Sequence, residues 1–466
     1  MGADPVLAAL AAACPAARPA QPEDAVAGMM PRFAASPATV GEASELLRAA
    51  AAHDLAVVPR GGSSKLGWGA PPRRVDLIVD TSGLDRVLEH AAGDLVVRVQ
   101  AGVSVAQLGE VLARAGQQLA LDPPPCPAPA NGMGSPEPGA TVGGTIATGA
   151  AGPRRLRYGT PRDMLIGITV VRADGTVTHS GGKVVKNVAG YDLGKLYTGS
   201  FGTLGLIVEA VFRLHPLPAS AAYVTVDCSG PDEAYRAVAA AAGSELAPSA
   251  IELDRPARDQ PVQVAVLVEG HPDGTAERAS LMCALLGKGA ATRPSPPGWW
   301  GWPARRNEQS GNDQSGDGQP RGAADTGQAG TLVRIGFWAA GLPQILRAVD
   351  AAALAVGLDP AVGGSAAAGV IYAAVGPDAD PAAVAAFVSG LRDALARGDG
   401  DARLASATVP DGPPVLASAV VVHAPPGARN LMDLWGPVPS LSLMRAVKDQ
   451  FDPGHRMAPG RFAGGI

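Results

Sequence analysis

Cysteine is scarce in this sequence, and the placement of its few cysteines excludes several kinds of site. The 466 residues contain four, and these lie far apart: Cys14, Cys126, Cys228 and Cys283. A structural zinc site or an iron–sulfur cluster needs cysteines at short, repeated spacings. We therefore interpret the four as small hydrophobic residues of a protein from a reducing compartment.

Charge and long apolar runs are also limited. Charged residues make up 17% of the sequence and the formal net charge is −5, which argues against a nucleic-acid partner. No apolar run is long enough to cross a bilayer, and no basic residue precedes the apolar segment from Val6 to Cys14 as in a secretory signal. We expect a cytoplasmic protein that meets the inner face of the cell membrane only through partners.

Several signatures of nucleotide-binding and hydrolytic proteins are missing. The sequence contains no GxxxxGK or GxGxxG loop, and no HExxH or GxSxG motif. None of the seven histidines forms a pair at a metal-ligand spacing. We therefore predict no metal site and assign no catalytic base.

Glycine and proline, in contrast, are abundant. The chain holds 60 Gly and 43 Pro, and 47% of it is hydrophobic, which is typical of a loop-rich globular protein with room for two or three domains. The glycines gather between Gly139 and Pro216, around two β-branched runs from Leu165 to Arg172 and from Leu204 to Leu214. Such glycines let a ligand approach the main chain, and a large, flat, anionic cofactor would suit them.

Two segments carry a family resemblance. PRGGSSKLGWG, from Pro59, and GGKVVKNVAGYDLGKLYTGSFGTLG, from Gly181, resemble the FAD-binding subunits of glycolate oxidases, within the flavoproteins related to vanillyl-alcohol oxidase and p-cresol methylhydroxylase (PCMH). The resemblance is close over residues 36 to 216. It implies an α+β fold, with a two-part PCMH-type FAD-binding domain and an antiparallel-sheet α+β cap domain.

The first candidate site is the loop after the predicted strand Ala56 to Val58. Consecutive backbone N–H groups in a Gly/Ser turn can bind an anion, and the resemblance implies the pyrophosphate of FAD, although alone the loop is more typical of a surface turn. The candidate residues are Arg60, Gly61, Gly62, Ser63, Ser64 and Lys65. Relatives that attach FAD covalently often carry a histidine in this loop. None is present here, so we predict non-covalent FAD.

Two further patches complete the predicted cofactor site. The resemblance implies a flavin-binding loop, for which a glycine-rich corner between sheets is the alternative, and a strand whose backbone meets the adenine end. The candidate residues are Gly143, Gly144, Thr145, Ala147, Thr148, Gly149, Tyr158 and Gly159 in the loop and Gly205, Ile207 and Val208 in the strand. Tyr191 and Asp192 could line the flavin or cap a short helix.

The pattern of apolar residues and the family resemblance together divide the chain into four parts. We expect an N-terminal tail over residues 1–35, the FAD-binding domain over 36–218, the cap domain over 219–425 and a segment over 426–466 that packs back on the FAD domain. The first half of the cap reads as strand, helix, strand, strand and helix, and the second half repeats this theme. Between the halves lies a polar insertion, 307–330, predicted to be disordered. Trp299, Trp300 and Trp302 more often indicate domain packing than a substrate site.

The resemblance implies one leading function and leaves two alternatives. The leading hypothesis is an FAD-carrying subunit that works beside a homologous FAD-binding catalytic subunit and an iron–sulfur subunit to oxidise glycolate, a small 2-hydroxy acid. One alternative is a self-sufficient flavin oxidoreductase acting on a larger 2-hydroxy acid or a sugar-derived alcohol. The other is a non-catalytic assembly subunit that has kept the flavin fold.

Overall fold

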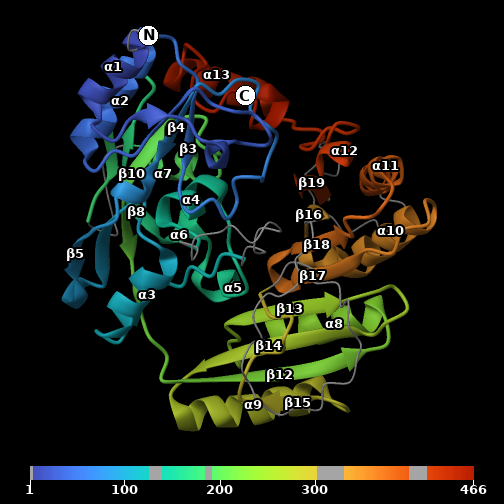
Figure 1. The fold of residues 1–466 in the computed structure, drawn as a ribbon. Helices are drawn as coiled ribbons and strands as arrows, with labels where there is room; N and C mark the ends of the chain where they lie inside the picture. The colour runs from blue at the N-terminus through green and yellow to red at the C-terminus, as the bar shows by residue number, and fades with distance from the viewer. Residues whose placement is uncertain (1–3, 125–138, 184–190, 302–329, 398–416) are drawn as a thin grey trace.

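The structure, a computed structural model, describes residues 4–124, 139–183, 191–301, 330–397 and 417–466. These residues form two units that lie side by side, as Figure 1 shows. The predicted disordered insertion 307–330 lies outside the described residues except for Gly330. The first unit holds two sheets with short helices, and the second is built on one large sheet.

The first sheet lies at the N-terminal end of the chain and has the strand order β1-β2-β4-β3. β4 pairs in parallel with both β2 and β3, and β1 pairs antiparallel with β2. Two helices pack on it (Figure 1). The bounds are β1 Arg18–Pro19, β2 Phe33–Ala35, β3 Val57–Arg60, β4 Leu77–Asp80, α1 Pro5–Ala13 and α2 Val40–Ala52.

The segment predicted to be an N-terminal tail is folded into this sheet. Leu10 of α1 is fully buried against α2, and β1 and β2 supply two of the four strands. The buried carboxylate of Asp24 pairs with Arg18 at 2.7 Å and with Arg60 at 3.0 Å. Sequence periodicity missed the two strands because they are only two and three residues long.

The second sheet is antiparallel, with the order β5-β6-β10-β8-β9. β5 and β6 follow each other in sequence and pair antiparallel as a hairpin. The bounds are β5 Val87–Ala91, β6 Val96–Gln100, β8 Leu165–Val171, β9 Val177–Gly181 and β10 Leu206–Arg213, with β7 Gln117–Gln118 and β11 His215–Pro216 as a separate pair. The helices of this part are α3 Val105–Ala113, α4 Val142–Thr148, α5 Arg155–Tyr158, α6 Pro161–Met164 and α7 Gly194–Tyr197.

The second unit is the predicted antiparallel α+β cap. Its sheet has the order β15-β12-β14-β13-β17-β18-β16-β19, and every pair in it is antiparallel. The strands are β12 Ser220–Cys228, β13 Ala250–Arg255, β14 Val262–Gly270, β15 Ala291–Arg293, β16 Thr331–Phe337, β17 Ala361–Ser365, β18 Val370–Val375 and β19 Ala417–His423. The helices are α8 Pro231–Ala242, α9 Pro272–Leu286, α10 Leu342–Leu354 and α11 Pro381–Arg397.

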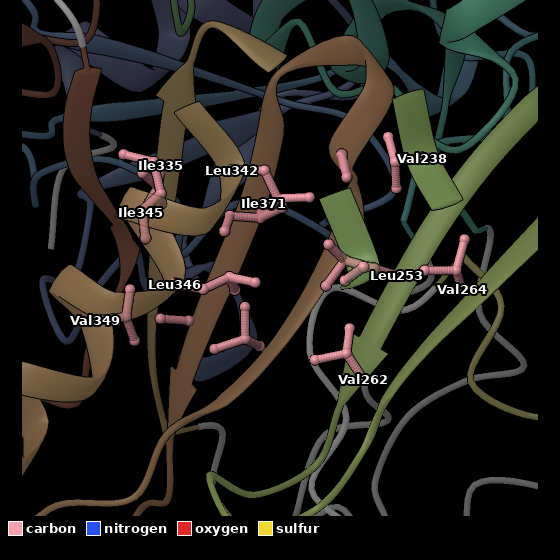
Figure 2. Close-up of a cluster of buried hydrophobic side chains, with 14 of the residues drawn as sticks. Val238, Leu253, Val262, Val264, Ile335, Leu342, Ile345, Leu346, Val349 and Ile371 are labelled. Carbon is pink, nitrogen blue, oxygen red and sulfur yellow. The ribbon is translucent and has the colours of Figure 1, made fainter. Parts of the chain in front are cut away.

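The strand order reveals an internal repeat. The run β12-α8-β13-β14-α9 is repeated as β16-α10-β17-β18-α11, and the two halves meet where β13 pairs with β17. The four helices cover one face of the sheet, away from the first unit (Figure 1). Valine and isoleucine at alternate strand positions point to that face, and Figure 2 shows them meeting Leu342, Ile345 and Leu346 of α10.

The opposite face of the cap sheet looks toward the first unit and carries polar side chains. Along β13, Ile251 and Leu253 belong to the helix-covered core, so Glu252 and Asp254 point the other way, toward α5. After β19 the chain returns to the first unit through α12, Pro426–Arg429, and α13, Leu441–Phe451 (Figure 1). Phe451 of α13 stacks edge-to-face on Tyr197, with ring centroids 5.7 Å apart.

Candidate functional site

Three segments of the first unit, far apart in sequence, enclose one pocket. They are the loop after β3, the helix α4 with the turn before it, and the turn that leads into β10. The empty space between its walls, about 780 Å³, includes solvent at the open side of the pocket. Of the predicted cofactor residues, those on its wall are Arg60, Gly61, Gly62, Ser63, Ser64, Lys65, Gly143, Gly144, Thr145, Ala147, Thr148, Gly205 and Ile207.

The loop after β3 is held by the side chain of Arg60. Its guanidinium donates to Asp80 Oδ2 at 2.8 and 3.0 Å and lies 3.0 Å from Asp24. Ser63 takes a left-handed conformation, with φ of 60°, as residues do in turns whose successive backbone N–H groups bind an anion. The two carboxylates compensate the charge of Arg60, so its main contribution is to fix the loop.

Two glycines of the pocket are required by the protein itself. A Cβ on Gly61 would lie 2.3 Å from Thr141 Oγ1, and a Cβ on Gly143 would lie 2.7 Å from the Cβ of Ala101. Both distances are shorter than non-bonded atoms tolerate, so at these positions the backbone lies directly against a neighbouring side chain. The sequence predicts that these glycines let a ligand approach the main chain. At these two positions they also make room for neighbouring protein atoms.

The segment predicted as a flavin loop is partly helical. Residues 142–148 form α4, and the Thr141 hydroxyl caps it by accepting from the Gly144 N–H at 3.2 Å. Buried Val142 and Ile146 anchor the helix in the core of the second sheet. The prediction of a loop was wrong here because tertiary burial outweighs the low helix propensity of glycine. One side of this helix lines the pocket.

The threonine hydroxyls of α4 are engaged within the helix. Thr145 Oγ1 donates to Thr141 O, and Thr148 Oγ1 donates to Gly144 O, both at 2.8 Å. A hydroxyl oxygen that donates to its own helix still has lone pairs that can accept a hydrogen bond. The two side chains therefore offer acceptors to a ligand more readily than donors.

Four of the candidate residues lie beside the pocket and do not line it: Gly149, Tyr158, Gly159 and Val208. Val208 follows Ile207 on β10 and points to the opposite face, where it is fully buried. Tyr191, the other aromatic candidate, is 91% exposed.

The Tyr158 hydroxyl joins the two units. It donates to Glu269 Oε2 of β14 at 3.1 Å, and Gln118 Nε2 lies 3.4 Å from it. Burial, together with the carboxylate of Glu269, raises the pKa of this phenol. Next to it, Arg154 donates to Gln118 Oε1 at 2.6 Å, while its backbone N–H donates to Asp122 Oδ2 at 2.9 Å. The interface is therefore polar and hydrogen-bonded.

A buried acid, Glu252, lies in the same interface. It projects from β13 toward α5, and the Ser365 hydroxyl donates to it. Burial raises the pKa of Glu252 to about 8, with the nearby Asp122 carboxylate adding to the rise and Arg155 opposing it. A carboxyl group with such a pKa holds its proton at neutral pH, and perturbed groups of this kind concentrate at functional sites.

The tryptophan cluster packs where the two units meet. Trp299 Nε1 donates to Gln263 Oε1 at 2.5 Å, and Trp300 stacks edge-to-face on Tyr223, with centroids 5.1 Å apart. The adjacent Gly301 faces the ring of Pro153 in the first unit. This agrees with a domain-packing role for Trp299 and Trp300; Trp302 lies outside the described residues.

Sequence reasoning missed part of the pocket wall. The residues not predicted include Pro59, Leu66, Thr81, Thr141, Phe201, Gly202, Leu206 and Arg461. Most are sequence neighbours of predicted residues. Arg461 is different, because it belongs to the C-terminal segment, far from the glycine clusters.

The described residues show neither a metal site nor a membrane-spanning helix. Within residues 4–124, 139–183, 191–301, 330–397 and 417–466, no three His, Cys, Asp or Glu side chains come together in a way that would hold a metal ion. Across the same ranges, no helix has the length and apolar character needed to span a membrane.

Comparison with known proteins defines the class of fold. Residues 31–181 match the model of the FAD binding domain family. The structure superposes on p-cresol methylhydroxylase with a TM-score of 0.66 over 98% of this chain and 96% of that one, at 15% identity. It superposes on alkyldihydroxyacetonephosphate synthase with a TM-score of 0.61 over 93% and 78% of the two chains, at 16% identity. Residues 31–181 are thus an FAD binding domain in a PCMH-type α+β fold, and FAD is its cofactor.

The curated relatives include oxidases and dehydrogenases. Glycolate oxidase subunit GlcD of Bacillus subtilis is 33% identical over 228 residues, 49% of this chain and 46% of that protein. D-lactate dehydrogenase of Archaeoglobus fulgidus is 38% identical over 180 residues, 39% and 38% of the two chains. D-2-hydroxyglutarate dehydrogenase of Xanthomonas citri is 35% identical over 188 residues, 40% and 38%. The matched region thus covers about half or less of the length of each of these relatives.

Proposed function

We propose that this chain binds FAD in the pocket between β3, α4 and β10 and serves as an FAD-carrying subunit of a glycolate oxidase or dehydrogenase complex. The observation that carries the proposal is the convergence of three distant segments on one pocket inside an FAD binding domain. Similarity to the GlcD subunit supports glycolate as the substrate and glyoxylate as the product. Similarity to dehydrogenases of lactate and 2-hydroxyglutarate supports the wider class of 2-hydroxy acids.

The residues of the pocket suit the proposed cofactor. The turn at Ser63 presents backbone N–H groups, which are suitable donors for a pyrophosphate. The small side chains at Gly144, Ala147 and Gly205 leave space for a flat ring system against the backbone. When bound, FAD supplies the two-electron acceptor needed to oxidise a hydroxy acid. The chain's own part is to hold and orient that cofactor.

A partner would have to carry the electrons onward in this proposal. The chain has four widely separated cysteines, so an iron–sulfur cluster would belong to a separate subunit. We further propose a homologous FAD-binding catalytic subunit as the second partner, and a cytoplasmic location with membrane contact through the assembled complex.

Co-purification tests this proposal. A tagged chain expressed with its genomic neighbours should bring down a second flavoprotein and an iron–sulfur protein, and the complex should bleach on anaerobic addition of glycolate. The isolated chain should be yellow but should not bleach with glycolate. A chain that purifies alone and is reduced by glycolate would exclude the auxiliary role. Colourless chain within the intact complex would favour an assembly subunit.

One observation favours a second candidate, a self-sufficient dehydrogenase of another 2-hydroxy acid. Relatives of 38% and 35% identity are dehydrogenases of D-lactate and D-2-hydroxyglutarate. Oxidation of such an acid requires a group that accepts the hydroxyl proton. Glu252, in the interface between the two units, is protonated at neutral pH because its pKa is raised to about 8, so it could accept that proton only where it is ionised, near pH 8 and above. Anaerobic bleaching of the isolated chain by D-lactate or D-2-hydroxyglutarate, but not by glycolate, would support this candidate.

A further inference from the structure

The C-terminal segment is bonded to the first sheet beside the cofactor pocket. The Val57 N–H donates to Arg456 O at 2.8 Å, and the Ala458 N–H donates to Val57 O at 2.7 Å, so residues around Met457 extend the sheet next to β3. Further along, the Ala70 N–H donates to Arg461 O at 3.1 Å. This pairing fixes the backbone of Arg461 against the loop that follows β3.

The side chain of Arg461 reaches back under that loop. Its Nη2 donates to Leu66 O at 2.7 Å and to Trp68 O at 2.8 Å. The residue is 4% exposed, and it is part of the pocket wall. Two bonds from one nitrogen fix the plane of the guanidinium, because the group is rigid. The position of its other nitrogens is therefore set before any ligand binds.

Arg461 Nη1 is buried and has no hydrogen-bond partner among the described residues. No carboxylate of the described chain forms an ion pair with this guanidinium, and burial lowers its pKa to about 10. The other guanidinium on the pocket wall, that of Arg60, is shared by Asp24 and Asp80. A buried donor on a cation is costly to leave unpaired, so such a group points to a missing acceptor.

We infer that Arg461 is a cofactor ligand carried by the C-terminal segment, and that its Nη1 donates to an anionic acceptor group of FAD. This inference rests on the proposed location of FAD in the pocket. Two parts of FAD offer such an acceptor: the pyrophosphate, and the N1 and O2 edge of the flavin, where negative charge develops on reduction. A guanidinium suits both, because it combines a permanent charge with several N–H donors.

The affinity for FAD of one variant and of its control tests this contact. Arg461→Met keeps the length of the side chain and removes every donor, so the Kd for FAD should rise about 10- to 100-fold, as expected for a lost charge-assisted hydrogen bond. Arg456→Met is the control, because Arg456 lies in the same segment but contacts Ala173 O at 3.4 Å, outside the pocket wall. Its Kd for FAD should stay within about twofold of the parent's.

Fluorescence titration of deflavinated protein with FAD gives these constants, and circular dichroism checks that each variant is folded. An unchanged Kd in a folded Arg461→Met protein would overturn the inference. Failure of the parent itself to bind FAD would instead defeat the proposed site. Arg461→Lys separates the two acceptors: a shifted flavin reduction potential assigns the contact to the flavin edge, and an unchanged potential with weaker binding assigns it to the pyrophosphate.

A measurement on the parent protein covers the case in which Arg461→Met does not fold. If Nη1 binds FAD, residues 456–462 should exchange their backbone hydrogens more slowly in the FAD-loaded protein than in the deflavinated one, because the ligand adds a bond to their anchor. Strand β14 of the cap provides an internal reference that FAD should leave unchanged. Equal exchange of residues 456–462 in the two forms would contradict the inference.

Discussion

The ammonium group of Lys448 lies 2.7 Å from the carboxylate of Asp452, and both side chains are buried, at 1% and 0% exposure. The same ammonium donates to Thr203 O at 2.7 Å and to Met457 O at 2.9 Å. Thr203 lies in the turn that leads into β10, and Met457 lies beside β3. One charged group therefore connects α13, the pocket wall and the C-terminal segment.

Replacement of Lys448 by Met should destabilise the protein by about 3–5 kcal/mol, because it leaves the Asp452 carboxylate buried without its counter-ion. Urea denaturation followed by circular dichroism measures the loss. Arg347→Met is the control, since its ion pair with Asp232 is more than half exposed on both sides and should contribute less than about 1 kcal/mol. Equal losses in the two variants would contradict the role given to Lys448.

Gly61→Ala should lower both stability and FAD content. Its Cβ would lie 2.3 Å from Thr141 Oγ1, and that hydroxyl caps α4, so relief of the clash must either turn the hydroxyl away from the cap or move the loop. We expect a loss of about 1–3 kcal/mol and a Kd for FAD raised about tenfold or more. The matched variant is Gly109→Ala in α3, where an added Cβ meets nothing within 4 Å; it should stabilise by about 0.5–1 kcal/mol.

Glu252 should impose a pH dependence on stability. Its pKa is about 8 in the folded protein, against an ordinary value of 4.5. Between these values the unfolded chain releases the proton and the folded chain keeps it, so the contribution is full below pH 4.5 and is lost as the pH rises toward 8. Glu252→Gln cannot ionise. Its stability should match the parent's near pH 4.5 and exceed it above pH 8 by on the order of a few kcal/mol.

Urea midpoints of the parent and of Glu252→Gln, taken at half-unit steps from pH 5 to 9, test this dependence. The difference between the two proteins should grow with pH. Parallel curves would mean that Glu252 is ionised in the folded protein.

FAD should leave the protein on acid denaturation. None of the described residues on the pocket wall is a histidine, cysteine or tyrosine, which are the side chains that could form a covalent bond to the flavin ring. After precipitation with trichloroacetic acid, the yellow colour and flavin fluorescence should appear in the supernatant. A fluorescent protein pellet would show a covalent link and would contradict the prediction.

Elements with strong local signals could be predicted from the sequence. Thr39 caps the amphipathic helix α2, both local signals, and the predicted β-branched runs became β8 and β10. In the cap, alternating valines indicated β12 and β14, while β17, with the sequence AVGGS, and β19 were missed. β17 is a strand only because β13 and β18 pair with it on both sides, which local sequence does not encode.

In the candidate site too, the residues with a local sequence signal could be predicted, and the residue placed by tertiary structure could not. Glycine patterns located the three segments of the pocket, because close backbone packing demands glycine at Gly61 and Gly143. Arg461 could not be found in this way, since an isolated arginine near the C-terminus carries no local signal. Its position follows from a backbone pairing with β3 that only the folded chain reveals.

The bonds between Arg461 and the loop after β3 also set an order of events in protein synthesis. Arg461 and Leu66 are 395 residues apart in sequence, and the whole cap domain is translated between them. A ribosome-bound chain can complete the β3 loop early, but it lacks this wall of the pocket until the segment around Arg461 has been made. Tight retention of FAD is therefore expected only after the cap domain has been translated, although the loop that would bind the cofactor is made long before it.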